Sequence, residues 1–293
     1  MSSIKQLAIR GAAWTFAAYG MSMILRLGSN LILTRLLLPE VYGLIALVYV
    51  FIIGLNLFSD VGIGPSIIQN KRGDDPDFLN TAWTIQVIRG ICLWIGSVLL
   101  AWPAAKFYEE PRLLLLLPVV GLNAIISGFN STALFTLNRQ VTIGKLAVYE
   151  LAGQVTSISV TIISAYFNPT VWAMVIGGFA SALVQMVWSH RLIPDQTNRF
   201  TWDTDALKNI FSFGKWIFVS TALYFFVSQS DRMILGKLIS LEMLGIYGIA
   251  FTLADIPRQV ILALSNKVIF PSFAKLADLP RETFRAKILK NRR

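Results

Sequence analysis

The chain has 293 residues, of which 55% are hydrophobic and only 14% charged, and its formal net charge is +10. A soluble domain carries about 25% charged residues. This composition, with a mean hydropathy of +0.62, therefore excludes an ordinary soluble domain and predicts an all-α, polytopic transmembrane bundle. The basic residues fall in short loops and a tail, which favours membrane topology over nucleic-acid binding.

The first long apolar run, residues 11–38, contains Arg26 near its middle. About 20 apolar residues cross a bilayer as a helix, and an arginine at that depth normally faces protein or water. A polar stripe shares its helix face, with members spaced four, three, four and three apart: Thr15, Tyr19, Ser22, Arg26 and Ser29. The stripe either lines a wet path or bonds neighbouring helices.

Further spans follow in chain order. Their expected ranges are residues 44–68, 78–102, 113–135, 145–167, 171–188, 211–238 and 245–270. Together with the first run they make about eight spans. Within the second, Asp60 precedes the sequence GIGP at residues 62–65, which should kink or break the helix. The third contains Arg89, and the fifth carries a polar stripe that includes Gln154.

The charges of the loops predict the orientation. One side carries Lys5, Arg10, Lys71, Arg72, Arg139, Lys145, Arg191, Arg199, Lys208 and the tail, and the other only Arg35, Lys106, Arg112 and Lys237. The richer side should be cytoplasmic, which places both termini inside. We interpret Lys71, Arg72, Arg139 and Lys145 as topology charges at the lipid surface.

An internal repeat is the most informative feature. At a shift of 202 positions Trp14 falls on Trp216, and further identical or similar pairs follow. These include Ile32 with Ile234, Arg35 with Lys237, Glu40 with Glu242 and Gly43 with Gly245. Six spans separate the copies, so both have the same orientation, as in transporters whose substrate site lies between parallel halves. The alternative is an eight-span protein in which the last two helices are not a repeat.

The repeat predicts the domain organisation. Residues 1–190 form an N-terminal six-helix lobe, and residues 191–210 are a cytoplasmic loop between lobes. Residues 211–273 are the first two helices of a parallel second lobe, and residues 274–293 are a basic cytoplasmic tail. On this interpretation the chain is truncated after the second helix of its second lobe.

Several stretches carry a resemblance to a known family. They are GAAW at 11–14, LTRLLLPEVYGL at 33–44, SDVGIGPSIIQNKR at 59–72, FGKW at 213–216, LGKLISLEMLGIYGIAF at 235–251 and VIFPSFAKLAD at 268–278. With these, the chain resembles the oligosaccharide/polysaccharide flippases of the multidrug/oligosaccharidyl-lipid/polysaccharide exporter superfamily. It is most similar to the lipopolysaccharide, colanic-acid and exopolysaccharide branch.

The resemblance implies a function. Two six-helix lobes would surround a central cavity and translocate undecaprenyl-pyrophosphate-linked sugar repeat units across the bacterial inner membrane. The implied partners are this lipid-linked oligosaccharide, the bilayer and the polysaccharide polymerase and chain-length machinery, with no nucleic acid. We expect no enzymatic activity and no cofactor. We also expect no metal site, because the chain has one cysteine, Cys92, and one histidine, His190, in a loop.

Candidate residues follow from the chemistry of such a substrate, because arginine binds phosphate oxygens with a charged fork. The expected substrate-path residues are Arg26, Arg89, Arg232, Arg258, Tyr19, Ser22, Asn30 and Gln154. Asp60 and Asp255 are candidates for a coupling ion. The competing interpretation is ion pairing, of Arg26 with Asp60, of Arg232 with Asp231 or Asp255, and of Arg258 with Asp255.

Three other classes compete with the flippase hypothesis. A drug or cation exporter of the same superfamily would carry acidic rather than basic membrane residues. A membrane-bound glycan polymerase or acyltransferase would need large outer loops or an embedded His or acidic constellation. A non-functional truncated fragment would have no activity.

Overall fold

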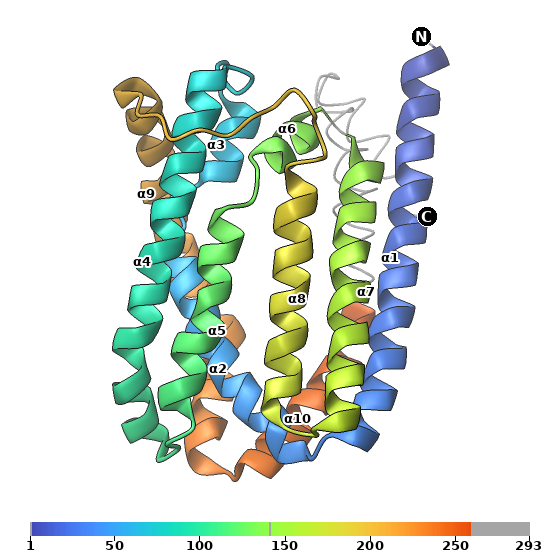
Figure 1. Ribbon diagram of the computed structural model, residues 1–293, viewed down its shortest axis with the longest axis vertical. Coiled ribbons are helices and arrows are strands. Elements are labelled where there is room, and N and C mark those ends of the chain that lie inside the picture. Colours follow the sequence, from blue (N-terminus) through green and yellow to red (C-terminus); the bar gives the residue numbers. More distant parts are fainter. Residues whose placement is uncertain (1, 141, 259–293) are drawn as a thin grey trace, which may run out of the picture. The chain divides into compact units, whose positions relative to one another are not determined.

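The computed structural model describes residues 2–140 and 142–258, and these residues form helices without any strand (Figure 1). The helices are α1 (Ser2–Leu36), α2 (Pro39–Phe58), α3 (Ile63–Gln69), α4 (Pro76–Tyr108), α5 (Leu113–Gly128), α6 (Ala133–Arg139), α7 (Ile143–Phe167), α8 (Val171–Ser189), α9 (Thr204–Leu238) and α10 (Leu241–Ala254). The expected all-α class is confirmed. Residues 1–248 form one compact unit and residues 249–293 a second, and the packing that follows concerns the first unit.

Among the described helices, α2, α4, α7 and α8 are long and apolar enough to cross a membrane, and α5 with α6 makes a fifth candidate. The expectation of eight spans therefore stays a prediction. The basic tail and the end of the last expected span lie outside the described residues. α9 begins at Thr204, earlier than the expected 211, because Asp203 caps its N-terminus by accepting from the backbone N–H of Asp205 and Ala206.

Two of the expected spans are broken helices. The second breaks between Phe58 and Ile63, slightly before the expected GIGP site, and Gly62 takes φ 72° there, a conformation that glycine adopts without strain. Pro65 then sits in the first turn of α3, where a missing N–H costs no helical bond. The fourth, expected as one helix over 113–135, breaks after Gly128, and α5 and α6 meet at a bend of 61°.

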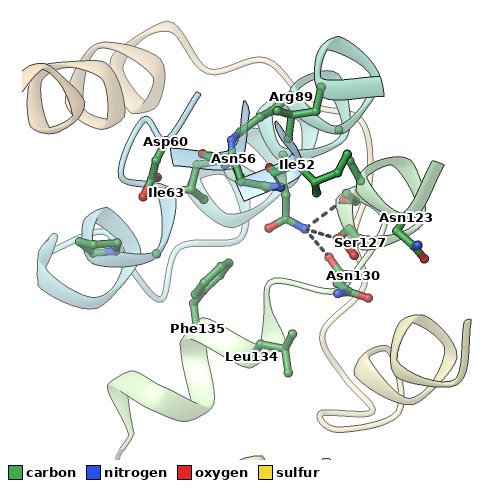
Figure 2. A pocket seen from close by; sticks show the side chains of 17 residues that line it. Ile52, Asn56, Asp60, Ile63, Arg89, Asn123, Ser127, Asn130, Leu134 and Phe135 are labelled. Carbon is green, nitrogen blue, oxygen red and sulfur yellow. Dashed lines mark hydrogen bonds between the residues drawn. The ribbon is translucent and has the colours of Figure 1, made fainter. Parts of the chain in front are cut away.

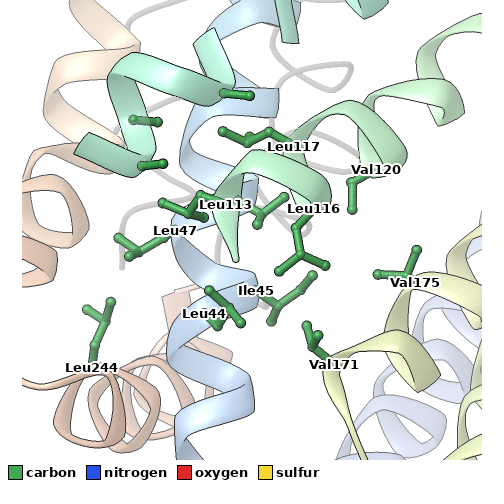
Figure 3. Packing of buried hydrophobic residues seen from close by; sticks show 14 residues of the cluster. Leu44, Ile45, Leu47, Leu113, Leu116, Leu117, Val120, Val171, Val175 and Leu244 are labelled. Carbon is green, nitrogen blue, oxygen red and sulfur yellow. The ribbon is translucent and has the colours of Figure 1, made fainter. Parts of the chain in front are cut away.

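α2 is the central helix of the first unit. Leu47, Val48 and Val50 on it are fully buried, and its middle lies in one apolar cluster with the start of α5, the end of α4 and the start of α8 (Figure 3). An all-round apolar helix is favourable where every face is covered. Farther along the chain, α9 packs on α2, and its first turns join α3 and α4 through the fully buried Ala206 and Ile210.

The helix bounds agree with the sequence repeat. α1 and α9 each have 35 residues, and Ser2 and Thr204 are 202 positions apart, as are Leu36 and Leu238. α2 and α10 begin at Pro39 and Leu241, again 202 positions apart.

The repeats meet at two equivalent glycines. A Cβ at Gly43 would collide with the carbonyl oxygen of Leu241, and a Cβ at Gly245 with that of Pro39. The two contacts are the same contact seen from each repeat, as a two-fold relation between the copies requires.

The segment between α8 and α9 is bound to α4. Three alternate backbone N–H groups of this segment donate to α4 side chains, from Arg199 to Asn80 Oδ1 (3.0 Å), from Thr201 to Thr84 Oγ1 (3.1 Å) and from Asp203 to Thr81 Oγ1 (3.0 Å). Arg72 forms ion pairs of 2.7 Å with both Asp75 and Asp203, the residues that cap α4 and α9. The segment is therefore a strap that joins the N-termini of these two helices.

The glycine contact makes a prediction about packing. Gly245→Ala should lower the free energy of unfolding by about 1–3 kcal/mol, because a methyl group is forced against a backbone carbonyl and the helices must separate. Thermal unfolding of the purified protein followed by circular dichroism measures the change. Gly28→Ala is the control, since a Cβ there meets no described atom within 4 Å. Equal stability of the two variants would contradict the contact.

The strap predicts a pH dependence. The hydrogen bond from Arg72 is the first cause that lowers the pKa of Asp203 below its ordinary 3.8. The Asp203 carboxyl therefore binds a proton more readily in the unfolded chain than in the folded one. Its interaction with Arg72 stabilises the folded protein fully above about pH 4, and this stabilisation is lost as the pH falls through the lowered pKa. Asp203→Asn should unfold at a lower temperature than the wild type at pH 7, and the gap should close at acid pH. Asp205→Asn, on the exposed side of the same turn, should show no such gap.

Candidate functional site

A cavity of about 430 Å³ lies between α2, α3, α4, α5 and α6 (Figure 2). Its polar lining residues are Asn56, Asp60, Gln86, Arg89, Asn123, Ser127 and Asn130, and the apolar part includes Ile52, Ile63, Leu134 and Phe135. The cavity sits beside the breaks in both broken spans. Its position thus follows from the two places where the membrane helices are interrupted.

Arg89 on α4 caps the end of α2. Its Nε donates to the backbone oxygen of Ser59 (2.9 Å) and to Ser59 Oγ (3.0 Å), and its Nη2 donates to the backbone oxygen of Asn56 (2.8 Å). A cation is favourable at a helix C-terminus, where the last carbonyl groups have no helical partner. The expected cationic residue therefore serves first as a helix cap.

Asp60 occupies the other side of the same break. Its Oδ1 accepts from the backbone N–H of Gly62 (2.9 Å), just before α3 begins. A carboxylate is favourable at a helix N-terminus. The break thus places a negative group at the start of α3 and a positive group at the end of α2.

Gln86 caps the end of α5 at the second break, as Arg89 caps the end of α2 at the first. Gln86 was not identified from the sequence. Its Nε2 donates to the backbone oxygens of Ser127 (3.4 Å), Gly128 (3.0 Å) and Asn130 (2.9 Å). Gln86 and Arg89 are three positions apart and therefore lie on one face of α4. Two hydrogen-bonding side chains three positions apart in an apolar run could have indicated that this face of the helix meets polar groups.

Ser22, in the polar stripe of α1, bonds to α7 and does not line this cavity. Ser22 Oγ donates to Gln154 Oε1 (2.5 Å), and Gln154 Nε2 donates to the backbone oxygen of Ser22 (2.8 Å). These two residues therefore join helices, as the competing interpretation held. Arg26 is exposed on the same helix, and Tyr19 and Asn30 are partly buried.

The candidates in the second repeat lie on α9 and after α10. Arg232 Nη1 donates to Gln229 Oε1 (3.5 Å), and Asp231 accepts from the hydroxyl of Tyr247 (2.6 Å). Arg258 and Asp255 form an ion pair. This agrees with the alternative interpretation of these two residues, in which they pair with each other.

Two of the four expected topology charges also hold loops in place. Arg139 Nη1 donates to the backbone oxygens of Ile67, Ile68 and Asn70, and Arg72 forms the ion pairs of the strap. Lys71 and Lys145 are exposed, as topology charges are. Arg72 and Arg139 therefore order the loops next to α3.

These features define a polytopic helical membrane protein that encloses a polar cavity between broken helices. The chain belongs to the polysaccharide biosynthesis protein family, whose model matches residues 32–290. No solved structure matches the chain.

Curated relatives have names from the same field. The chain is 23% identical over 279 residues to the lipopolysaccharide biosynthesis protein WzxC of Escherichia coli, covering 94% of this chain and 56% of the relative. It is 23% identical over 280 residues to the teichuronic acid biosynthesis protein TuaB of Bacillus subtilis, covering 94% and 57%. The succinoglycan biosynthesis transport protein ExoT of Rhizobium meliloti is 21% identical over 267 residues, with 91% and 54% covered. The chain thus spans about half the length of these relatives.

The caps at the two breaks predict a large effect on stability. Arg89→Met leaves the acceptors at the end of α2 without their donor, and Gln86→Leu does the same at the end of α5. An unsatisfied buried group costs about 1–3 kcal/mol, and these acceptors are partly buried, so each variant should lower the free energy of unfolding by up to about that amount. Thermal unfolding in detergent measures it. Arg191→Met, at an exposed position, should change little, and an Arg89→Met variant as stable as this control would remove the capping role.

Proposed function

We propose that this protein contributes to the flipping of undecaprenyl-pyrophosphate-linked oligosaccharide repeat units across the bacterial inner membrane, for lipopolysaccharide or exopolysaccharide synthesis. The observation that carries the proposal is membership of the polysaccharide biosynthesis protein family over residues 32–290. The name of ExoT, a succinoglycan biosynthesis transport protein, supports transport rather than catalysis. Membership of a family alone does not give a mechanism, so the chemistry must come from the residues.

The substrate sets the physical problem. A charged pyrophosphate and a polar glycan cannot cross hydrocarbon without hydrogen-bond partners, whereas the lipid tail can stay in the bilayer. Arginine suits the pyrophosphate because its guanidinium is always charged and binds oxygens in a fork. We propose Arg26 on α1 and Arg232 on α9 as contacts of this kind, on helices that the repeat makes equivalent. Tyr19 and Asn30 would lie along the same path.

The remaining assignments belong to the same proposal. Both termini would be cytoplasmic, by the distribution of loop charges. The polysaccharide polymerase and the chain-length machinery would act on the translocated unit. Asp60 or Asp255 would carry a coupling ion, although hydrogen bonding at a helix start and ion pairing already account for their positions.

Complementation tests the function. We expect a bacterium that lacks its own flippase to regain surface polysaccharide when it expresses this chain joined to the remaining half of a relative such as WzxC. The chain alone serves as the comparison. Polymer at the cell surface is measured by extraction and sugar analysis, and protein level by immunoblot. No export from the joined protein at normal protein level would contradict the proposal.

Within that assay, Arg26→Ala should reduce export at least tenfold at unchanged protein level, because the pyrophosphate loses a cationic contact. Arg35→Ala is the matched control, since Arg35 is exposed at the end of the same helix. Equal export from both variants would remove Arg26 from the substrate path.

A further inference from the structure

We infer that the cavity between α2 and α6 binds one uncharged sugar unit of the oligosaccharide and not its pyrophosphate. This inference rests on the proposed function and names the part of the substrate that this cavity recognises. It differs from the sequence-based expectation, in which Arg89 is a cationic contact for phosphate. Three observations support it: the balanced charge of the lining, the asparagine oxygens that accept no hydrogen bond, and the ring of Phe135 in the lining.

The charge of the lining is balanced. Arg89 is its one cation and Asp60 its one carboxylate, and no other charged residue lines the cavity within the described part of the chain. The guanidinium has committed its Nε–H and one N–H of Nη2 to the end of α2, so three of its five N–H groups remain for a ligand. A pyrophosphate prefers several converging cationic groups. A lining with a single cation, balanced by one carboxylate, therefore favours a neutral ligand.

The amides of the lining have unused hydrogen-bonding capacity. Oδ1 of Asn123 and Oδ1 of Asn130 are buried, and neither accepts a hydrogen bond from the residues that the structure describes. Ser127 lies near them in the lining (Figure 2) and is exposed. An amide offers both an acceptor and donors, and a hydroxyl both donates and accepts. Both oxygens are almost without accessible surface, so a sugar hydroxyl pairs with them when the asparagine side chain turns toward the cavity. Each such pairing relieves the cost of a buried, unsatisfied oxygen.

Phe135 supplies an apolar surface next to these amides. In Figure 2 its ring points from α6 toward the polar residues of the cavity. Gly64 makes room for the ring, because a Cβ there would lie 2.9 Å from it. The negative face of an aromatic ring attracts the slightly positive C–H groups of an apolar face, and a sugar ring has such a face besides its hydroxyls. Amides beside an aromatic ring thus match both sides of a sugar.

The size of the cavity limits the ligand. A volume of about 430 Å³ is at the lower end of the range for small-molecule pockets, about 300–1,000 Å³. It accommodates one sugar ring with its substituents rather than a whole repeat unit. The site would therefore select for the identity of one sugar while the pyrophosphate is held elsewhere.

Saturation-transfer NMR tests this inference directly. The full chain is placed in lipid nanodiscs, because alkyl maltoside detergents carry sugars of their own. The probes are glucose, galactose, fucose and N-acetylglucosamine, with inorganic pyrophosphate as competitor. We expect saturation of the ring protons of at least one sugar, and no displacement by equimolar pyrophosphate.

Two variants locate the binding. Asn130→Ala removes an amide, and Ser127→Leu fills the cavity without removing any hydrogen bond that the Ser127 side chain makes in the described structure. Each should reduce the saturation at least fivefold. Asn138→Ala, at an exposed position on α6 outside the cavity, should leave it unchanged. Ser127→Leu keeps the test decisive if Asn130→Ala fails to fold.

The outcomes separate this inference from the proposed function. Displacement of the sugar by pyrophosphate, no saturation of any of the four sugars, or saturation that Ser127→Leu does not reduce would each overturn the sugar site. If the joined protein still restores polysaccharide export in those cases, the proposed function stands without it. Sugar binding without export would retain the site and contradict the function.

Discussion

A helix that is interrupted inside a membrane leaves carbonyl and N–H groups that lipid cannot hydrogen-bond, and each such group must be satisfied by protein. In this chain one unbroken helix, α4, supplies the partners for two interruptions. Arg89 caps the end of α2 and Gln86 caps the end of α5, one helical turn apart. The cavity depends on this arrangement, because it lies beside the two breaks, where α2 is followed by α3 and α5 bends into α6.

This arrangement changes the meaning of a membrane arginine. The depth of a cation in an apolar run indicates that it faces something other than lipid, but depth does not indicate whether a ligand or a backbone carbonyl is its partner. Two of the three guanidinium nitrogens of Arg89 donate to backbone oxygens at the end of α2. Arg139, near the end of α6, likewise donates to backbone oxygens at the end of α3. Basic residues therefore cap helix ends at the breaks of this fold, and fewer of their N–H donors remain for a substrate than the sequence alone indicates.

The sequence predicted the fold where the signal was local and repeated. Apolar runs gave the all-α class and the long helices α2, α4, α7 and α8, and glycine at 62 marked the first break. The second break was missed because residues 113–135 were expected to form one span. The turn-rich cluster SGFNST at residues 127–132 could have indicated it. Likewise, Asp203 is a helix-start signal that would have placed α9 correctly.

Other features depended on three-dimensional neighbours and could not be predicted. The spacing of polar residues on one helix fixes which residues share a face, but not which helix they meet. Ser22 was expected to face a substrate, and its hydrogen bonds with Gln154 lie across α1 and α7, 132 positions apart in the chain. The partner of Gln86 is likewise set by where α5 breaks. The candidate site was therefore predicted only in Arg89 and Asp60, the two residues whose depth in the membrane was itself informative.

The two repeats are in contact at one end of α2 and are held by the strap at the other. Gly43 and Gly245 bring two backbones into contact where α2 and α10 begin, at the end of α2 opposite its break. No side chain separates the helices at these two positions, and the adjacent Leu244 is buried in the same apolar cluster as Leu44 and Leu47 of α2. The strap, by contrast, binds the start of α9 to α4 through Arg72 and three backbone N–H groups. The second repeat is therefore joined to the first by close backbone packing at the glycines and by hydrogen bonds and an ion pair at the strap.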